Sequence, residues 1–291
     1  MISTENKSPS RLPIWITTRL TRSPLGNEVR SAVAAGGLHT ICQEARCPNR
    51  GECWDAGTAT FLILGNVCTR NCLYCGVRHG APAPPDLNEP ARILDAVRKL
   101  GCRYVVITSV TRDDLPDGGA VHFVSVTEAL RKDSPDTRVE LLVPDFRGDS
   151  DALKIIVGIQ PDVLGHNLEI IERLFPSLRP QGSYKRSLAL LEFAKKHHTT
   201  LPLKSGLMVG LGETREEISE ALRDLFSVGV NIVTVGQYLR PNRECVPVVR
   251  YLHPDEFEEI RQEAIDIGFS SAVCGPLVRS SYHAEEAAEN I

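Results

Sequence analysis

Two groups of three cysteines are the residues of this sequence best suited to chemistry. They are spaced C-x4-C-x5-C and C-x3-C-x2-C, and they comprise Cys42, Cys47 and Cys53, followed by Cys68, Cys72 and Cys75. A disulfide framework is not expected, because the total of nine cysteines is odd and a chain of 291 residues can bury a core without cross-links. Thiolates are soft ligands for zinc and for iron–sulfur clusters. The two triplets therefore predict metal or cluster binding.

Each triplet supplies three thiolates, whereas a four-iron cluster has four irons. A cluster held by three cysteines keeps one iron open, and an open iron can bind a substrate or a cofactor. The spacing also allows two structural zinc sites, completed by His79 or by a distant cysteine. Of the isolated cysteines, Cys102 and Cys274 are expected to be small buried hydrophobic residues.

Strand-like and helix-like segments alternate through most of the chain. The strand-like segments are Thr58–Gly65, Arg103–Val110, Arg138–Val143, Asp162–Asn167, Leu203–Val209 and Asn231–Tyr238. The helix-like segments are Glu89–Leu100, Gly119–Lys132, Asp151–Ile159, Ser187–His198, Glu216–Val228 and Pro254–Ile267. Such alternation indicates a parallel sheet with crossover helices, either an open doubly wound sheet or an incomplete barrel.

The carboxyl ends of parallel strands form the binding edge in both architectures, so polar residues there are candidate ligands. The second cysteine triplet follows the first strand, and Asn167 and Glu169 follow the fourth. These two could bind a cofactor or form a hydrogen-bonded pair at the rim. Lys204, at the start of the fifth strand, is either a ligand contact or a surface residue. Asp113, Asp114 and Asp117 form an acidic loop that could contact a cofactor or a carrier, although a solvated loop is the more frequent explanation for such a run.

The repeated units leave residues 1–57 and 270–291 outside as extensions that could cover the open rim, with residues 58–269 as the barrel. The chain carries 33 Lys and Arg against 37 Asp and Glu, a net charge of −4, which gives no support to a nucleic-acid partner. No window is apolar enough to cross a bilayer, and the first residues lack an apolar signal core. A cytoplasmic location without membrane contact is therefore expected.

The C-x3-C-x2-C run after the first strand resembles that of the radical S-adenosylmethionine (SAM) enzymes. Further segments resemble the lipoyl synthases, in order, from about Leu38 to Ala284. They are Cys42–Trp54, Thr58–Val77, Thr108–Ala120, His166–Glu169, Lys204–Thr214, Val235–Pro241 and Gly275–Ala284. The resemblance implies an incomplete parallel (β/α)6 barrel with N- and C-terminal extensions. It also implies a sulfurtransferase that inserts two sulfur atoms at carbons 6 and 8 of an octanoyl group.

The resemblance further implies two 4Fe–4S clusters and assigns their ligands. Cys68, Cys72 and Cys75 would hold the cluster that binds SAM through its open iron. Cys42, Cys47 and Cys53 would hold an auxiliary cluster that is consumed as the sulfur donor. Its fourth ligand would be a serine of the motif Arg279–Tyr282, namely Ser281, although spacing does not exclude Ser280. Cys68, Cys72, Cys75 and Ser281 are thus the expected catalytic residues, and Asn167, Glu169 and Lys204 the expected SAM contacts.

The partners that this resemblance implies are an octanoylated carrier and an electron donor. The carrier would be the glycine cleavage H-protein or the acyltransferase subunit of a 2-oxoacid dehydrogenase, and the donor ferredoxin or flavodoxin. The chain departs from the family pattern at Asn66, Ile170 and Cys245, where Asp, Thr and His are usual, which leaves fine catalytic detail open. The alternatives are another radical SAM sulfur-insertion or methylthiolation enzyme, or a zinc-stabilised scaffold without catalysis.

Overall fold

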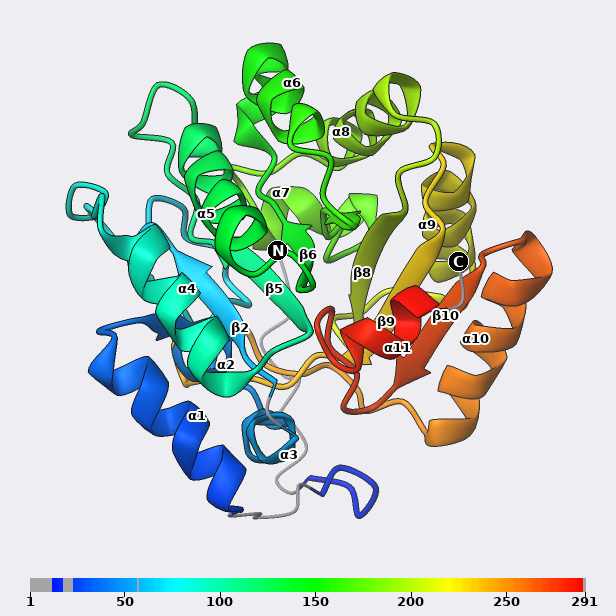
Figure 1. Cartoon of the computed structure of the whole chain (residues 1–291). Helices are drawn as coiled ribbons and strands as arrows, with labels where there is room; N and C mark the ends of the chain where they lie inside the picture. Colours follow the sequence, from blue (N-terminus) through cyan, green and yellow to red (C-terminus); the bar gives the residue numbers. More distant parts are fainter. Residues whose placement is uncertain (1–11, 18–22, 57, 290–291) are drawn as a thin grey trace.

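A curved sheet of eight strands forms the centre of the computed structural model, which describes residues 12–17, 23–56 and 58–289 (Figure 1). The strands are ordered β1-β2-β5-β6-β7-β8-β9-β10. Their bounds are β1 His39–Thr40, β2 Thr60–Ile63, β5 Tyr104–Ser109, β6 Arg138–Leu142, β7 Val163–Gly165, β8 Leu203–Val209, β9 Ile232–Gln237 and β10 Ser271–Gly275. From β2 to β10 every neighbouring pair is parallel, and only β1 is antiparallel to its neighbour. The expected incomplete parallel barrel is therefore confirmed.

Helices cover the outer face of this sheet, as Figure 1 shows. The crossover helices are α4 Glu89–Leu100, α5 Ala120–Asp133, α6 Ser150–Gly158, α8 Tyr184–His197, α9 Arg215–Ser227 and α10 Pro254–Ile267. Shorter helical segments are η1 Phe146–Gly148, η2 Glu172–Leu174 and α7 Phe175–Leu178. The six crossover helices agree with the helices expected from periodicity to within three residues at each end. Strands buried on both faces carry mainly apolar residues, as in β9, where every residue is buried.

Local sequence explains where several helices begin and end. Thr214 and Glu217 form the capping box that the sequence predicts at the start of α9. His253 caps α10 in the same reciprocal way with Glu256. Helix α4 ends at Gly101, whose φ of +62° suits the left-handed conformation of a C-terminal cap.

The C-terminal segment contributes more to the sheet than the sequence suggested. Residues Ser271–Gly275 form β10, a seventh parallel strand beside β9, so the barrel has one more strand than the six expected. Helix α11, Ala284–Glu289, then packs against buried residues of the sheet, where Ala284 contacts Tyr104 and Val106. The prediction of six strands depended on strand-like segments alternating with helix-like ones. Strand β10 has five residues and no crossover helix after it, so this alternation does not reveal it.

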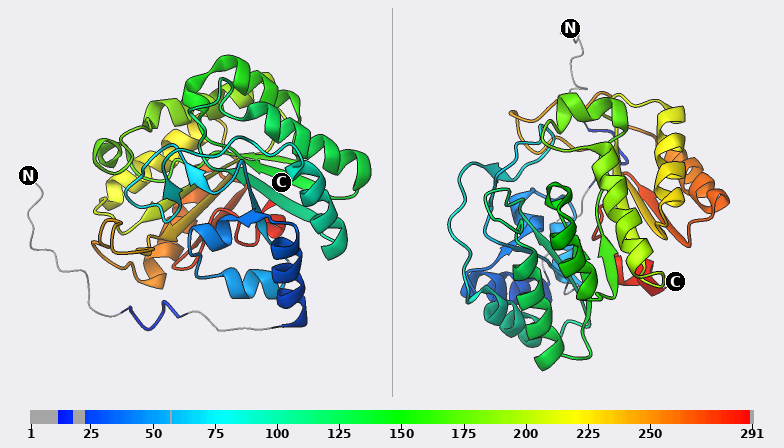
Figure 2. Two further views of the ribbon diagram at one scale, coloured as in Figure 1. Left: turned by 90° about the vertical axis from the view of Figure 1, so that its left-hand side faces the viewer. Right: turned by 90° about the horizontal axis from the view of Figure 1, so that it is seen from above.

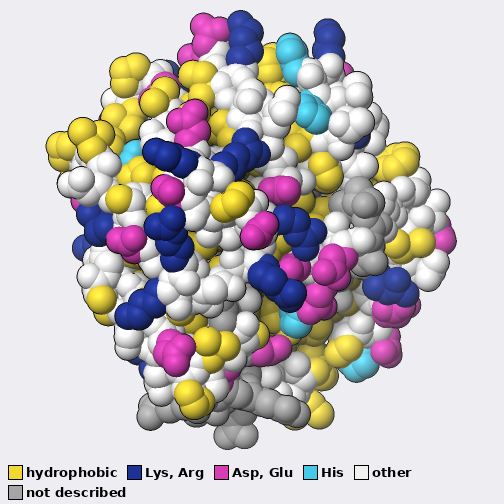
Figure 3. Space-filling view, viewed as in Figure 1, with side chains coloured by type: hydrophobic (Ala, Val, Ile, Leu, Met, Phe, Trp, Pro, Cys, Tyr) yellow, Lys and Arg dark blue, Asp and Glu magenta, His cyan; other side chains and the backbone are white. Residues whose placement is uncertain are grey.

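The N-terminal segment lies along the β2 side of the sheet. It forms α1 Pro24–Ala35, α2 Ile41–Glu44 and α3 Arg50–Asp55, and it adds β1 to the edge of β2. The left view of Figure 2 shows these helices grouped at the lower right of the molecule. The face in Figure 3 mixes basic and acidic side chains, in keeping with a net charge of −4. Within the described residues, no helix has the length and apolarity needed to cross a membrane.

Candidate functional site

The second cysteine triplet lies in a loop that follows β2. This loop opens at β3, Val67–Cys68, and closes at β4, Arg78–His79, which pairs with β3. The backbone N–H of Cys75 donates to the carbonyl of Cys72 over 3.0 Å. Cys75 keeps part of its surface exposed, yet the protein atoms crowded around its sulfur raise the pKa of the thiol to about 12, and the nearby Cys72 and Cys68 thiols add to this rise. The three thiols are therefore neighbours that need a cation to become thiolates.

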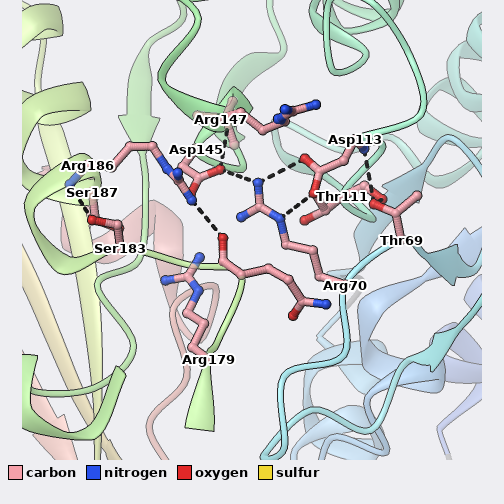
Figure 4. Close-up of polar contacts among 12 residues, drawn as sticks. Thr69, Arg70, Thr111, Asp113, Asp145, Arg147, Arg179, Ser183, Arg186 and Ser187 are labelled. Carbon is pink, nitrogen blue, oxygen red and sulfur yellow. Dashed lines mark hydrogen bonds and ion pairs between the residues drawn. The ribbon is translucent and has the colours of Figure 1, made fainter. Parts of the chain in front are cut away.

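Arg70, inside this loop, fastens the triplet to the carboxyl ends of β5 and β6 (Figure 4). Its Nε donates to Asp113 Oδ2 over 2.7 Å, and its Nη2 donates to Asp145 Oδ1 over 2.6 Å. Arg186, from α8, donates to the other oxygen of Asp145 over 2.8 Å. Burial alone would raise the pKa of Asp145, but bonds and charge from Arg70, with the charge of Arg186, hold it below its ordinary value. The loop between Cys68 and Cys72 is thus fixed by charge-assisted bonds in a buried place.

Asp113 keeps 26% of its side-chain surface exposed and also pairs with the buried Arg70, so the expectation of a solvated acidic loop leaves out this ion pair. Its neighbour Asp114 pairs with Arg112, whose Nη2 lies 2.8 Å from Asp114 Oδ2. Asp117 accepts backbone N–H bonds, including that of Gly119 over 3.0 Å. These three aspartates thus hold a turn and two arginines in place. The sequence shows that they are acidic but does not show these partners.

Loops after β7 and β9 form hydrogen bonds with the other side of the cysteine loop. The backbone N–H of Leu73 donates to the carbonyl of Leu178 over 2.8 Å, and that of Val246 donates to Leu73 over 2.9 Å. The thiol of Cys245 donates to the carbonyl of Cys75 over 3.4 Å. Cys245 is buried, so a cysteine in place of the usual histidine supports the backbone next to the triplet.

Asn167 and Glu169 lie together at the carboxyl end of β7. Asn167 Nδ2 donates to Glu169 Oε1 over 3.0 Å. Burial raises the pKa of Glu169, and the Arg179 guanidinium and the Asn167 amide oppose that rise. Glu169 has a φ of +75°, a conformation that costs a non-glycine residue on the order of 1–3 kcal/mol and is often retained at ligand sites. Asn167 and Glu169 thus form the expected rim pair, and Arg179 places a positive charge beside it and near Cys72.

Lys204 does not join this pair, and its placement corrects the expectation of a SAM contact. Its Nζ lies 3.0 Å from Glu140 Oε1, and the Tyr104 hydroxyl donates to Glu140 Oε2 over 2.6 Å. Glu169 pairs with Leu207, three residues further along β8 than Lys204, which is about 10 Å of strand. Lys204 is therefore a buried ion-pair partner toward the amino ends of the strands.

The first triplet is carried by the N-terminal segment, with Cys42 in α2, Cys53 in α3 and Cys47 between the two helices. The N–H of Cys47 donates to the carbonyl of Cys42 over 3.1 Å, and that of Cys53 to the carbonyl of Asn49 over 2.9 Å. Burial raises the pKa of the Cys53 thiol to about 12, and the Cys42 and Cys47 thiols reinforce the shift. These three sulfurs are thus also neighbours, although their sequence spacing differs from that of the second triplet.

The C-terminal segment Pro276–Tyr282 reaches this first triplet. Asn49 Nδ2 donates to the carbonyl of Leu277 over 2.5 Å, and the Tyr282 hydroxyl donates to Glu52 Oε1 over 2.8 Å. These two hydrogen bonds therefore join the C-terminal segment to α3 and to Asn49, which directly precedes α3.

The same segment also reaches the rim pair after β7. Ser280 Oγ donates to Asn167 Oδ1 over 2.9 Å. Arg279 is close enough to Cys47 and to Glu169 for both to oppose the lowering of its pKa that burial causes. The segment that carries Ser281 thus lies between the first triplet and the residues beside the second.

Buried polar atoms without a hydrogen-bond partner indicate whether these residues fit a bound group. Among the described residues, the buried side-chain atoms without a hydrogen-bond partner are Trp54 Nε1, Arg70 Nη1, Arg92 Nε and Ser109 Oγ. Trp54 follows Cys53, Arg70 lies inside the second triplet, and Ser109 ends β5. An unpaired buried donor costs about 1–3 kcal/mol, so three of them at these places indicate partners supplied by bound groups.

No group of three or more described His, Cys, Asp or Glu side chains has the arrangement that a single metal ion requires. A four-iron cluster is wider than one ion and takes one thiolate per iron, so its ligands stand further apart. The clustered thiols and orphaned donors fit such clusters. Three arginines were not among the expected site residues: Arg70 and Arg179, which are buried, and Arg279, which is half-buried. Arg70 and Arg279 lie in the segments that resemble the family, whereas nothing in the sequence marked Arg179.

Comparisons with known proteins agree with this architecture. The family model described as "Radical SAM superfamily" matches residues 62–225, more than half of the chain. The structure resembles methylornithine synthase (PylB), with a TM-score of 0.55 at 14% identity over 88% of this chain and 82% of that one. It also resembles SuiB of Streptococcus suis bound to precursor peptide SuiA, with a TM-score of 0.55 at 12% identity over 80% and 53% of the two chains. The fold and the matched region define a radical SAM protein.

Curated relatives narrow the assignment. The chain is 50% identical to a lipoyl synthase of Escherichia fergusonii over 100% of its own length and 91% of that protein. It is 51% identical to a lipoyl synthase of Cronobacter sakazakii over 98% and 89% of the two chains. The chain belongs to the lipoyl synthase family, and the resemblance seen in its sequence is confirmed.

Proposed function

We propose that the protein inserts two sulfur atoms at carbons 6 and 8 of a protein-bound octanoyl-lysine, using SAM and two 4Fe–4S clusters. The observation that carries this proposal is that two separate thiol triplets are joined by one C-terminal segment, which contacts the surroundings of both. When bound, the clusters supply an electron that cleaves SAM, so that an unactivated C–H bond can be attacked, and sulfur for the product.

Cys68, Cys72 and Cys75 hold the cluster that binds SAM. Three thiolates leave one iron without a protein ligand, and that iron is available to the cofactor. Arg70 keeps the intervening loop in a fixed shape through its two carboxylate partners, Asp113 and Asp145. The protein thereby positions the reactive group on the rigid ends of two strands.

Asn167 and Glu169 are the proposed SAM contacts. Both lie at the end of β7, and Arg179 places its charge beside Glu169 and Cys72. An amide and a carboxylate there can hydrogen-bond hydroxyl or ammonium groups of the cofactor. Lys204 is left out of this set because Glu140 already takes its charge.

Cys42, Cys47, Cys53 and Ser281 hold the auxiliary cluster. The hydroxyl of Ser280 is already committed to Asn167, whereas Ser281 Oγ makes no hydrogen bond within the described residues. This difference favours Ser281 as the fourth ligand. Oxygen is a harder ligand for iron than sulfur, which suits a cluster that is taken apart during turnover.

The partners and the location follow from this chemistry. The octanoyl group is carried by a lipoyl carrier, either the glycine cleavage H-protein or the acyltransferase subunit of a 2-oxoacid dehydrogenase. Ferredoxin or flavodoxin supplies electrons. Cluster ligands must stay reduced, which favours the cytoplasm.

Two measurements test the proposed function. The anaerobically reconstituted chain should be brown and hold about eight irons, as two four-iron clusters require. With reductant, SAM and an octanoylated carrier peptide, the peptide should gain the mass of two sulfurs. Two zinc ions without visible absorption would instead support a scaffold. Cleavage of SAM without a thiolated peptide would indicate another radical SAM reaction.

A further inference from the structure

The indole N–H of Trp54 is an unexplained donor beside the first triplet. Trp54 directly follows Cys53 in α3, and its side chain is 2% exposed. Within the described residues, its Nε1 is buried and has no hydrogen-bond partner. A buried N–H without an acceptor costs about 1–3 kcal/mol, so its retention calls for an acceptor that becomes effective only when a group is bound nearby.

The indole of Trp54 is close to the thiol of Cys42. Burial raises the pKa of the Cys42 thiol, whereas the backbone N–H of Thr60 and the Trp54 indole both lower it, as donors close to a sulfur do. The indole therefore lies next to the thiol although the two do not meet as a hydrogen bond. A thiolate ligating iron carries more negative charge than a thiol and is the stronger acceptor.

The indole ring is held firmly in this position. The guanidinium carbons of Arg30, from α1, and Arg50, from α3, lie 5.8 and 5.7 Å from the ring centroid. Two cations at these distances attract the ring electrons and leave its N–H a better donor. The ring also belongs to the main hydrophobic core, with Val29 and Val33 of α1. Reorientation toward another acceptor would break this packing.

The other tryptophan provides a comparison within the same chain. Trp15 Nε1 donates to the carbonyl of Leu252 over 3.1 Å. This fold therefore satisfies an indole N–H where no cluster is expected, and leaves one unsatisfied where a cluster is expected.

We propose that Trp54 donates its indole N–H to the Cys42 sulfur when the auxiliary cluster is bound, and so raises the reduction potential of that cluster. Hydrogen bonds to ligating sulfur stabilise the added negative charge of the reduced cluster. Trp54 is thus a positioning residue that acts through Cys42. The inference rests on the proposed function, in that Cys42 must be a cluster ligand.

The test uses the full chain with Cys68, Cys72 and Cys75 replaced by alanine, so that only the auxiliary cluster forms. Trp54→Phe removes the donor, and Trp15→Phe is the matched control. We expect Trp54→Phe to keep its iron and to shift the midpoint potential, followed by electron paramagnetic resonance, to a more negative value. Trp15→Phe should leave the potential unchanged. An unchanged potential in Trp54→Phe would overturn the inference.

A second measurement decides the matter if Trp54→Phe loses its cluster. Labelling tryptophan with 15N at the indole nitrogen allows the unsubstituted ring to be examined by electron–nuclear double resonance on the reduced cluster. A 15N coupling that is retained in Trp15→Phe supports the hydrogen bond, because Trp54 is then the one labelled indole left, and no coupling refutes it. If the parent chain binds no iron at all, the proposed function fails, whereas a normal cluster without coupling overturns only the role of Trp54.

Discussion

Replacing Arg70 by lysine should loosen the loop that carries the second triplet. The guanidinium of Arg70 is 4% exposed and reaches Asp113 and Asp145 simultaneously, over 2.7 and 2.6 Å. A lysine ammonium is a single point and cannot span both carboxylates. Arg70 makes two charge-assisted bonds to Asp113 and one to Asp145, so at least one is then lost, at about 1.5–3 kcal/mol. Asp145 keeps Arg186, so the loss should stay below the 3–5 kcal/mol roughly expected for a buried charge left alone.

The assay compares the free energy of unfolding of the iron-free chain with the iron retained after reconstitution. We expect Arg70→Lys to lose about 1.5–3 kcal/mol, on the order of 10- to 150-fold in the folding equilibrium, and to lose iron from one cluster faster. Arg173→Lys is the control, because Arg173 makes a similar fork with Glu217 but is 55% exposed. Such an exposed pair contributes only about 0–1 kcal/mol. Equal unfolding free energies and equal iron retention in Arg70→Lys and the parent chain would refute the reasoning.

Three further predictions concern Ser281, Lys204 and His166. Ser281→Ala should bind an auxiliary cluster yet fail to complete the second sulfur insertion; a normal lipoyl yield by mass spectrometry would exclude it as a ligand. Lys204→Met should cost about 3–5 kcal/mol in urea unfolding by leaving Glu140 buried and unpaired, with SAM affinity retained; a loss of that affinity in the folded variant would restore Lys204 as a contact. Burial lowers the pKa of His166 to about 4, so the folded state binds fewer protons than the unfolded state between pH 4 and 6.5. Stability of the iron-free chain should therefore fall as pH drops from 6.5 toward 4, by up to roughly 3 kcal/mol, and His166→Gln should flatten that slope in urea titrations, whereas an equal slope in both chains would contradict it.

The alternating pattern of the sequence predicted the crossover helices and the central strands because each had a complete period and clear end signals. The Thr214–Glu217 capping box is the plainest case. Strand β10, Ser271–Gly275, was missed because its pairing with β9 is a long-range choice and no crossover helix follows it. Segment 271–275 is a strand because it pairs with β9, and its own residue pattern does not indicate this.

The type and spacing of six cysteines predicted metal or cluster binding, and the family resemblance implied which cluster each triplet would hold. The structure places each triplet as a group of neighbouring thiols. Arg70 and Asp145 are 75 residues apart, so no local pattern could pair them. Lys204 was assigned to the binding edge from its place near a strand start, but parallel strands bind ligands at their other end. In the sequence Trp54 was only one letter of a motif. That its indole N–H is buried without a hydrogen-bond partner can be seen only in the folded chain.

The central claim is that sulfur from the protein's own cluster ends in an octanoyl product. The direct test is to reconstitute the chain with 34S-labelled sulfide, remove free sulfide, and add reductant, SAM and an octanoylated carrier peptide. The account predicts a peptide that has gained two 34S atoms. A peptide without added sulfur, or with unlabelled sulfur only, would contradict it.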